Sequence, residues 1–180
     1  MGNVIASTEQ MIEKINDVLK TKKNAVVNIV NDKLTLSVFA LLEQNLKNVK
    51  EINFVIRDTK FVPEKSEISH EFEMAPADIL YNSYDIVEKN KLKHFAKAKA
   101  MHDFIKANVN VKRANPKTKI GGNIIIIDDD FMIQGSSSLE VSPKKKSNGF
   151  RNINFDTMLN GTMDKEQILS ALNIFNQIWF

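Results

Sequence analysis

The stretch that decides the fold reads GGNIIIIDDDFMIQGSSS and spans residues 121–138. Its four consecutive isoleucines are typical of a β-strand that is buried on both faces. Asp129 and Asp130 then favour a tight turn into the apolar residues 131–133, because aspartate tolerates the backbone conformations of such turns. We therefore expect a β-hairpin here. Three neighbouring carboxylates also suggest a site for a hard cation, but consecutive side chains diverge, so we favour the turn and predict no metal.

Helical and extended patterns alternate in the sequence before this hairpin. Ser7 and Gln10 have the spacing of a capping box, and apolar residues at helical spacing continue to about Lys22. A β-branched run, a second helical pattern and an alternating apolar run follow, at residues 25–30, 34–46 and 51–57. Helices that separate strands indicate crossover connections, so we expect a sheet that is at least partly parallel.

The remaining segments complete the predicted α/β pattern. We expect an irregular excursion, a lysine-rich helical region and a strand, at residues 58–76, 78–107 and 109–111. A basic loop follows the strand as far as Lys119. Residues 152–159 are predicted to form a strand with Ile153, Phe155 and Leu159 on one face. Asp164 then caps a final helix with apolar positions up to Trp179.

Length and composition favour one globular domain over residues 1–180. The chain has 43% apolar and 26% charged residues and contains no cysteine, which excludes disulfides and thiolate metal sites. No apolar run approaches the roughly 20 residues that span a bilayer, and no signal peptide is apparent. We expect a cytoplasmic protein without membrane insertion. Walker A, G-x-G-x-x-G and HExxH motifs are absent, so no cofactor is predicted.

The basic residues are almost all lysines. The sequence has 25 lysines and arginines against 22 acidic residues, and its arginines are Arg57, Arg113 and Arg151. Lysine acts as a point charge towards phosphate, so any contact with nucleic acid should involve the backbone more than the bases. A compositional bias of the genome predicts the same excess of lysine, and both explanations stay open.

The spacing of Asp128, Gly135 and Ser136 resembles the signature of the phospholipase D superfamily, H-x-K-x-x-x-x-D-x-x-x-x-x-x-G-S-x-N. The apolar residues 124–127 fill the gap before the aspartate. Residues 154–156, Asn-Phe-Asp, look like the N-x-E strand of that family, and the last helix is similar to its closing helix. The resemblance implies an α/β fold, a mixed β-sheet flanked by helices on both faces in a phospholipase D-like α-β-α sandwich.

The departures from this signature suggest that catalysis is lost. Gly121 takes the place of the histidine, Asn123 that of the lysine and Ser138 that of the asparagine, so the degenerate motif positions are Gly121, Asn123, Asp128 and Gly135. The resemblance implies that the histidine would be the nucleophile and the lysine would stabilise charge on the phosphoryl oxygens. Losing one such donor costs on the order of a hundred- to a thousand-fold in rate. We predict no catalytic residue.

Other histidines offer an alternative nucleophile. His70, His94 and His102 lie far in sequence from the degenerate motif, and the neighbouring Glu71 and Asp103 side chains diverge from them. Packing or solvent-facing roles are the simpler interpretation. A migrated nucleophile is the alternative.

Basic segments on both sides of the motif predict a phosphate-binding rim. The predicted phosphate- or nucleic-acid-binding residues are Lys112, Arg113, Lys117, Lys119, Asn123, Ser136, Ser137 and Ser138. A lysine run at residues 144–146 completes this rim. Two solvated loops without a partner are the alternative.

These observations lead to one functional hypothesis and two rivals. The domain is similar to N-terminal modules of bacterial helicases and Swi/Snf-type translocases, and its apolar last helix suggests the N-terminal fragment of a larger protein. We predict a catalytically silent module that binds the DNA or RNA backbone or acts as a scaffold, and that can pair as a homodimer. The rivals are an active phosphodiesterase or nuclease, and a protein-interaction domain.

Overall fold

A seven-stranded β-sheet is the centre of the structure, a computed structural model that describes residues 3–5, 7–31, 42, 44–56, 100, 103–114, 120–137, 139 and 155–179. Within these ranges the strands are β1 (Asn3–Ile5), β2 (Ala25–Asn31), β3 (Val49–Ile56), β4 (Val109–Arg113), β5 (Asn123–Ile127), β6 (Phe131–Gly135) and β7 (Asp156–Asn160). The long helices are α1 (Thr8–Thr21) and α6 (Lys165–Trp179). Shorter helical segments occur at residues 44–46 and 103–108.

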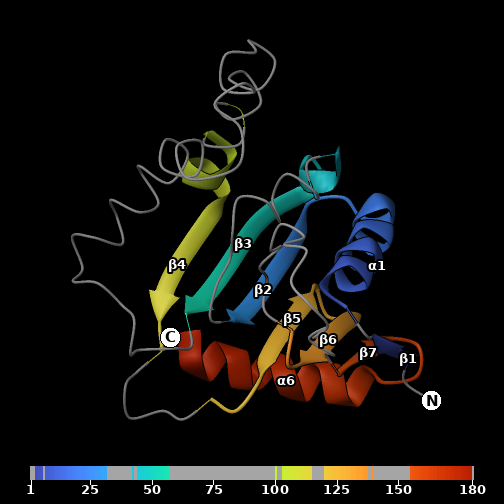
Figure 1. Cartoon of the computed structure of the whole chain (residues 1–180). Helices are drawn as coiled ribbons and strands as arrows, with labels where there is room; N and C mark the ends of the chain where they lie inside the picture. The colour runs from blue at the N-terminus through green and yellow to red at the C-terminus, as the bar shows by residue number, and fades with distance from the viewer. Residues whose placement is uncertain are drawn as a thin grey trace, which may run out of the picture.

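The sheet is mixed, as the alternation of helices and strands predicts. Its order is β1-β7-β6-β5-β2-β3-β4. β2, β3 and β4 run parallel, whereas β5, β6, β7 and β1 pair antiparallel with their neighbours. β1 and β4 therefore lie at the two edges, and the hairpin of β5 and β6 lies near the middle (Figure 1).

The two long helices cover opposite faces of this sheet, which confirms the predicted fold class. α1 buries Met11, Ile12, Ile15 and Leu19 in the larger of two apolar clusters. α6 buries Ile168 and Phe175 in the other cluster and runs beneath the sheet from β7 towards β4 (Figure 1). The Ser7 hydroxyl accepts a hydrogen bond from the Gln10 amide at 3.2 Å, so the predicted N-cap of α1 is confirmed.

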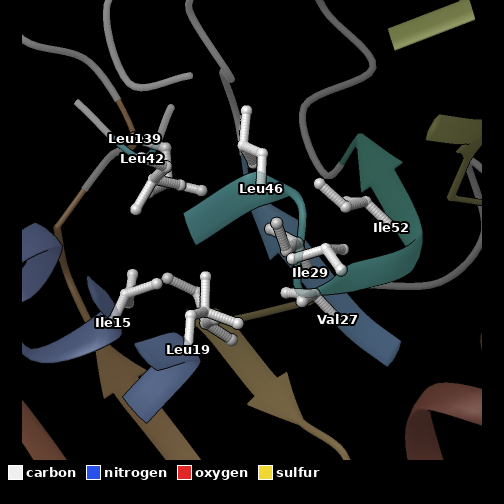
Figure 2. A pocket seen from close by; sticks show the side chains of 10 residues that line it. Ile15, Leu19, Val27, Ile29, Leu42, Leu46, Ile52 and Leu139 are labelled. Atoms are coloured by element: carbon white, nitrogen blue, oxygen red, sulfur yellow. The ribbon is translucent and has the colours of Figure 1, made fainter. Parts of the chain in front are cut away.

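The core between α1 and the sheet is apolar throughout. Figure 2 shows its side chains from the helix, the strands and the segment after β6, and they surround a void of only about 20 Å³. A void of this size holds about one water molecule, and an apolar lining offers that water no partner. This void is therefore a packing feature and no candidate for a substrate site. Its lining residues are Ile15, Leu19, Val27, Ile29, Leu42, Leu46, Val49, Ile52, Ile125 and Leu139.

The expected hairpin is confirmed, and its turn connects the sheet to α1. Asp128 has a left-handed backbone with φ of 54°, a conformation that aspartate tolerates. Its carboxylate accepts a hydrogen bond from the Val26 amide at 2.9 Å. The Lys22 ammonium lies 3.2 Å from Asp128 Oδ2 and 2.6 Å from Asp130 Oδ2. These contacts fix the end of α1 against the hairpin.

The middle aspartate of the turn binds the other helix. Lys165, the first residue of α6, donates to Asp129 Oδ2 at 2.5 Å. The hydrogen bond and charge of Lys165 lower the pKa of the Asp129 carboxyl below its ordinary value of 3.8. Within the described ranges, no group of three or more His, Asp or Glu side chains is placed to hold a metal ion.

Replacing Lys22 by methionine should lower the free energy of unfolding by about 1 kcal/mol, because a partly exposed charge pair contributes about this much. Partial burial lowers the pKa of Lys22, but its hydrogen bonds with Asp130 and Asp128 outweigh this and raise the pKa above 10.5. Because the pKa of Lys22 is higher in the folded protein than in the unfolded chain, its charge contributes its full stability below pH 10.5. This contribution is lost as the pH rises through the folded-state pKa. Urea denaturation should therefore show a smaller difference in unfolding free energy between the wild type and Lys22→Met at strongly alkaline pH than at neutral pH. An equal difference at both would contradict this role.

Two expectations about the strands need correction. β4 extends to Arg113, so Lys112 and Arg113 lie in a strand and not in the predicted basic loop. Hydrogen bonding to β3 continues up to the Ile56 and Arg113 pair, which explains the longer strand. The strand expected at residues 152–159 begins only at Asp156, so Phe155 precedes β7 and is 73% exposed, whereas Leu159, expected on the same face, is buried. The alternating pattern did not reveal where pairing with β6 begins.

Several predicted segments lie outside the described residues. They include most of the helical regions at 34–46 and 78–107, the excursion at 58–76 and the lysine run at 144–146. No helix in the described ranges has the length and apolarity needed to span a bilayer.

Candidate functional site

Four residues form a lateral row across adjacent strands at the carboxyl end of β2. Asn123 of β5 pairs with Gly135 of β6, and Gly135 pairs with Asp156 of β7. Asn31 follows Val30, which pairs with Ile124, so it stands beside Asn123. We call Asn31, Asn123, Gly135 and Asp156 the polar row. It contains two positions of the degenerate motif, Asn123 and Gly135, at the place where the resemblance predicts an active site.

Ser137 connects the members of this row. Its carbonyl accepts hydrogen bonds from Nδ2 of Asn31 at 3.2 Å and from Nδ2 of Asn123 at 2.8 Å. Its backbone amide donates to Asp156 Oδ1 at 3.0 Å, and its hydroxyl donates to Asp156 Oδ2. The Leu139 amide donates to Asn31 Oδ1 at 3.3 Å. The chain after β6 is thus held across the row by its own polar groups.

These polar side chains are hidden from solvent. Asn31 is 0% exposed, Ser137 1% and Asp156 2%. A buried carboxylate is costly unless hydrogen bonds satisfy it. The Ser137 amide and hydroxyl supply two such bonds to Asp156. A substrate cannot reach this hydroxyl and carboxylate pair without displacing the chain at Ser137.

Because Gly135 has no side chain, the Asp156 carboxylate can occupy the space next to it. A Cβ atom at position 135 would lie 2.6 Å from the Asp156 Cα and still closer to Asp156 Oδ1 and the Phe155 carbonyl oxygen. Real Cβ atoms do not approach other atoms so closely. The glycine that the sequence motif identified is therefore required by its contact with β7.

Among the buried side-chain atoms of the described residues, one acceptor in the row and no donor lacks a hydrogen-bond partner. Asn123 directs its donor to the carbonyls of Ser136 and Ser137, at 3.5 and 2.8 Å, and is 6% exposed. Among the described residues, its buried Oδ1 has no hydrogen-bond partner. Phosphate requires donors or positive charge. Phosphate binding by Asn123 and Ser137 remains a prediction, and their donors have internal partners.

The two other predicted positions next to the row are open to solvent. Gly121 is exposed, and a Cβ atom there would meet no atom within 4 Å. Ser136 is also exposed, and its hydroxyl oxygen accepts a hydrogen bond from the Phe155 amide at 3.2 Å. Both residues lie where the resemblance places a substrate, but neither offers a nucleophile that a base activates.

Lys112 and Arg113 lie at the same end of the sheet but at its far edge. The strand order puts β4 three positions away from β5, which corresponds to about 14 Å at the usual strand spacing. The Lys112 ammonium donates to the Trp179 carbonyl at 2.7 Å and lies 4.6 Å from the centre of the Trp179 ring. A cation at the carboxyl end of α6 is favourable because of the helix dipole. Lys112 therefore fastens α6 to β4.

The other predicted phosphate-binding residues, Lys117, Lys119 and Ser138, lie outside the described residues, as do His70, His94 and His102. Asp128 lies within the described residues, in the hairpin turn at the end of β5 that is opposite the polar row. Sequence reasoning missed Asn31, because a lone asparagine at a strand end carries no spacing signal. Asp156 was noted as part of the N-x-E-like segment, and its position beside Gly135 depends on pairing of β6 with β7.

Several solved structures have a similar fold. NucT from Helicobacter pylori matches with a TM-score of 0.55 at 11% identity, over 99% of this chain and 94% of that chain. Nuc from Salmonella typhimurium, a phospholipase D family member, has a TM-score of 0.54 at 12% identity, over 99% and 93%. A polyphosphate kinase from Porphyromonas gingivalis has a TM-score of 0.50 at 8% identity, over 98% of this chain and 26% of that chain.

At such low identity these similarities show the fold alone, which is the predicted phospholipase D-like α/β fold. No protein-family model matches the sequence, and no curated protein matches it.

Proposed function

We propose that this chain is a catalytically silent phospholipase D-like domain that binds the backbone of DNA or RNA. The observation that carries the proposal is the environment of Gly121 and Asn123. Position 121 has no side chain to attack phosphorus, and position 123 carries a neutral amide that donates into the protein. Attack on a phosphodiester needs a nucleophile and a group that stabilises charge on the phosphoryl oxygens.

The binding half of the proposal rests on charge. The chain has a formal net charge of +3 and a strong preference for lysine over arginine. Lysine contacts with phosphates give binding that is largely independent of base sequence and weakens as salt increases. This behaviour suits a module that holds nucleic acid for a partner domain.

The proposal includes a setting inside a larger ATP-dependent helicase or translocase. Helicase motifs in the reading frame downstream of Phe180 would support that setting.

The proposal also allows homodimers, and light scattering during size-exclusion chromatography tests the oligomeric state directly.

Purified protein should bind labelled DNA or RNA without hydrolysing it. Fluorescence anisotropy at about 50 and 200 mM salt should show clearly weaker binding at the higher concentration, since phosphate contacts release bound counterions. The same protein should hydrolyse neither labelled DNA nor a phosphodiester reporter. Failure to bind any nucleic acid at the lower salt concentration would instead favour the protein-interaction domain.

Variants with His70, His94 or His102 replaced by alanine separate a migrated nucleophile from a contaminating nuclease. Sustained turnover by the wild type that disappears in one of these variants would overturn the silent site. Equal turnover in all proteins would indicate contamination. These variants are preferable to Asp128→Ala, because Asp128 holds the hairpin turn to Val26 and Lys22.

A further inference from the structure

An open hollow lies at the end of the sheet opposite the polar row. It measures about 550 Å³ and is lined by Lys20, Gln44, Asn45, Lys47 and Asn48. The hollow lies between the last turn of α1 and the segment that leads into β3. Sequence reasoning did not predict this site, because its residues come from two segments that carry no shared motif.

The walls of the hollow are fixed by hydrogen bonds. Asn45 donates to the Asn16 side-chain oxygen at 2.6 Å, and Asn48 donates to the Leu19 carbonyl at 2.9 Å. The Ala25 amide donates to the Asn48 carbonyl at 2.8 Å. Residues 45–48 are thereby tied both to α1 and to the start of β2. The hollow is formed before any ligand binds, which lowers the entropic cost of binding.

Exposed lysines line this hollow or lie at the same end of the sheet. Lys20 and Lys47 belong to its lining, and the pairing of Ala25 with Val49 brings Lys23 and Lys50 to the same end of the sheet. Lys20 pairs with Asp17 at 3.2 Å. Within the described part of the chain, the ammonium groups of Lys23, Lys47 and Lys50 form no ion pair. We call the hollow, together with Lys20, Lys23, Lys47 and Lys50 at this end of the sheet, the basic hollow.

We propose that the basic hollow is a binding site for the phosphates of a nucleic-acid backbone. This inference rests on the proposed function and places its contact surface away from the degenerate motif. The polar row directs its donors inward, whereas Lys23, Lys47 and Lys50 of the basic hollow are exposed and form no ion pair within the described residues. Several separate charges suit a chain of phosphates better than one small anion. Lysines act as point charges, so the site reads no base sequence.

Charge-neutral substitutions test this site. The double variant Lys47→Gln with Lys50→Gln should raise the Kd for a labelled duplex on the order of tenfold and lower the salt slope by about two. Lys14→Gln, at an exposed position of α1, should leave both quantities close to those of the wild type. Circular dichroism verifies that each variant is folded.

A second double variant separates this inference from the proposed function. Lys117→Gln with Lys119→Gln removes the same number of charges from positions that precede the degenerate motif in sequence. If only this variant weakens binding, nucleic-acid binding stands and the basic hollow is wrong. If the wild type does not bind at all, the proposed function itself fails. Calorimetry with inorganic phosphate tests whether the hollow binds a small anion instead. The proposal would be overturned if phosphate bound tightly and the lysine variants bound the duplex as well as the wild type does.

Discussion

Replacing Gly135 by alanine is expected to destabilise the domain by about 3 kcal/mol, the upper range for inserting a methyl group into a packed interior. The new Cβ would collide with the Asp156 carboxylate and with the Phe155 and Asp156 backbone. Two of these three obstacles are backbone atoms, so rotation of a side chain cannot relieve the strain. Thermal or urea denaturation of purified protein measures the loss, which should appear as a large drop in Tm or in urea midpoint.

Other glycines of the same segment provide matched controls. A Cβ at Gly121 meets nothing within 4 Å, and one at Gly122 meets only the Gly135 carbonyl at an ordinary 3.6 Å. Gly121→Ala and Gly122→Ala should therefore stay within about 0.5 kcal/mol of the wild type. If Gly135→Ala were as stable as these variants, β6 and β7 could not pack as closely as described.

Replacing Asp156 by alanine should cost about 3 kcal/mol, because it leaves the Ser137 amide and hydroxyl buried without an acceptor. Ser137 is 1% exposed, so bulk solvent does not reach these two donors in the folded protein. The segment that crosses the polar row would lose its attachment to β7. Chemical denaturation measures the effect, and Phe155→Ala serves as the control because that neighbouring side chain is 73% exposed.

Double variants test whether Asp156 acts through the contacts described. Asp156→Ala and Ser137→Ala should be clearly less than additive, since both remove the same hydrogen bond. The cost of Gly135→Ala should fall in the Asp156→Ala background but not vanish, because the Phe155 carbonyl still obstructs the new Cβ. Fully additive losses would mean that the three residues do not form one unit.

In the proposed function, the polar row stabilises the end of the sheet and takes no part in a reaction. Asn31, Asn123 and Asp156 bind the protein's own chain through Ser137. In that proposal these side chains bind the chain at Ser137 instead of a substrate. In the proposed function, selection therefore acts on the stability of the end of the sheet and on surface charge rather than on turnover.

Sequence alone determined the parts of the fold that depend on local patterns. The isoleucines before Asp128 and the apolar residues after Asp130 predicted the hairpin, because burial and turn chemistry are readable from neighbouring residues. The Ser7 cap and the apolar stripe of α6 gave both long helices for the same reason. The spacing of Asp128 and Gly135 predicted the phospholipase D-like fold, whereas the silent site at Gly121 and Asn123 stays a prediction.

Only the tertiary structure decided which side chains meet. Asn31 and Asp156 are 125 positions apart in sequence, yet strand pairing brings both to Ser137. Lys112, expected at a phosphate rim, binds Trp179 because β4 lies beside the end of α6. The basic hollow likewise combines α1 with the segment before β3. Such contacts depend on strand order and register, and these are set by the packing of the whole sheet rather than by any local stretch of residues.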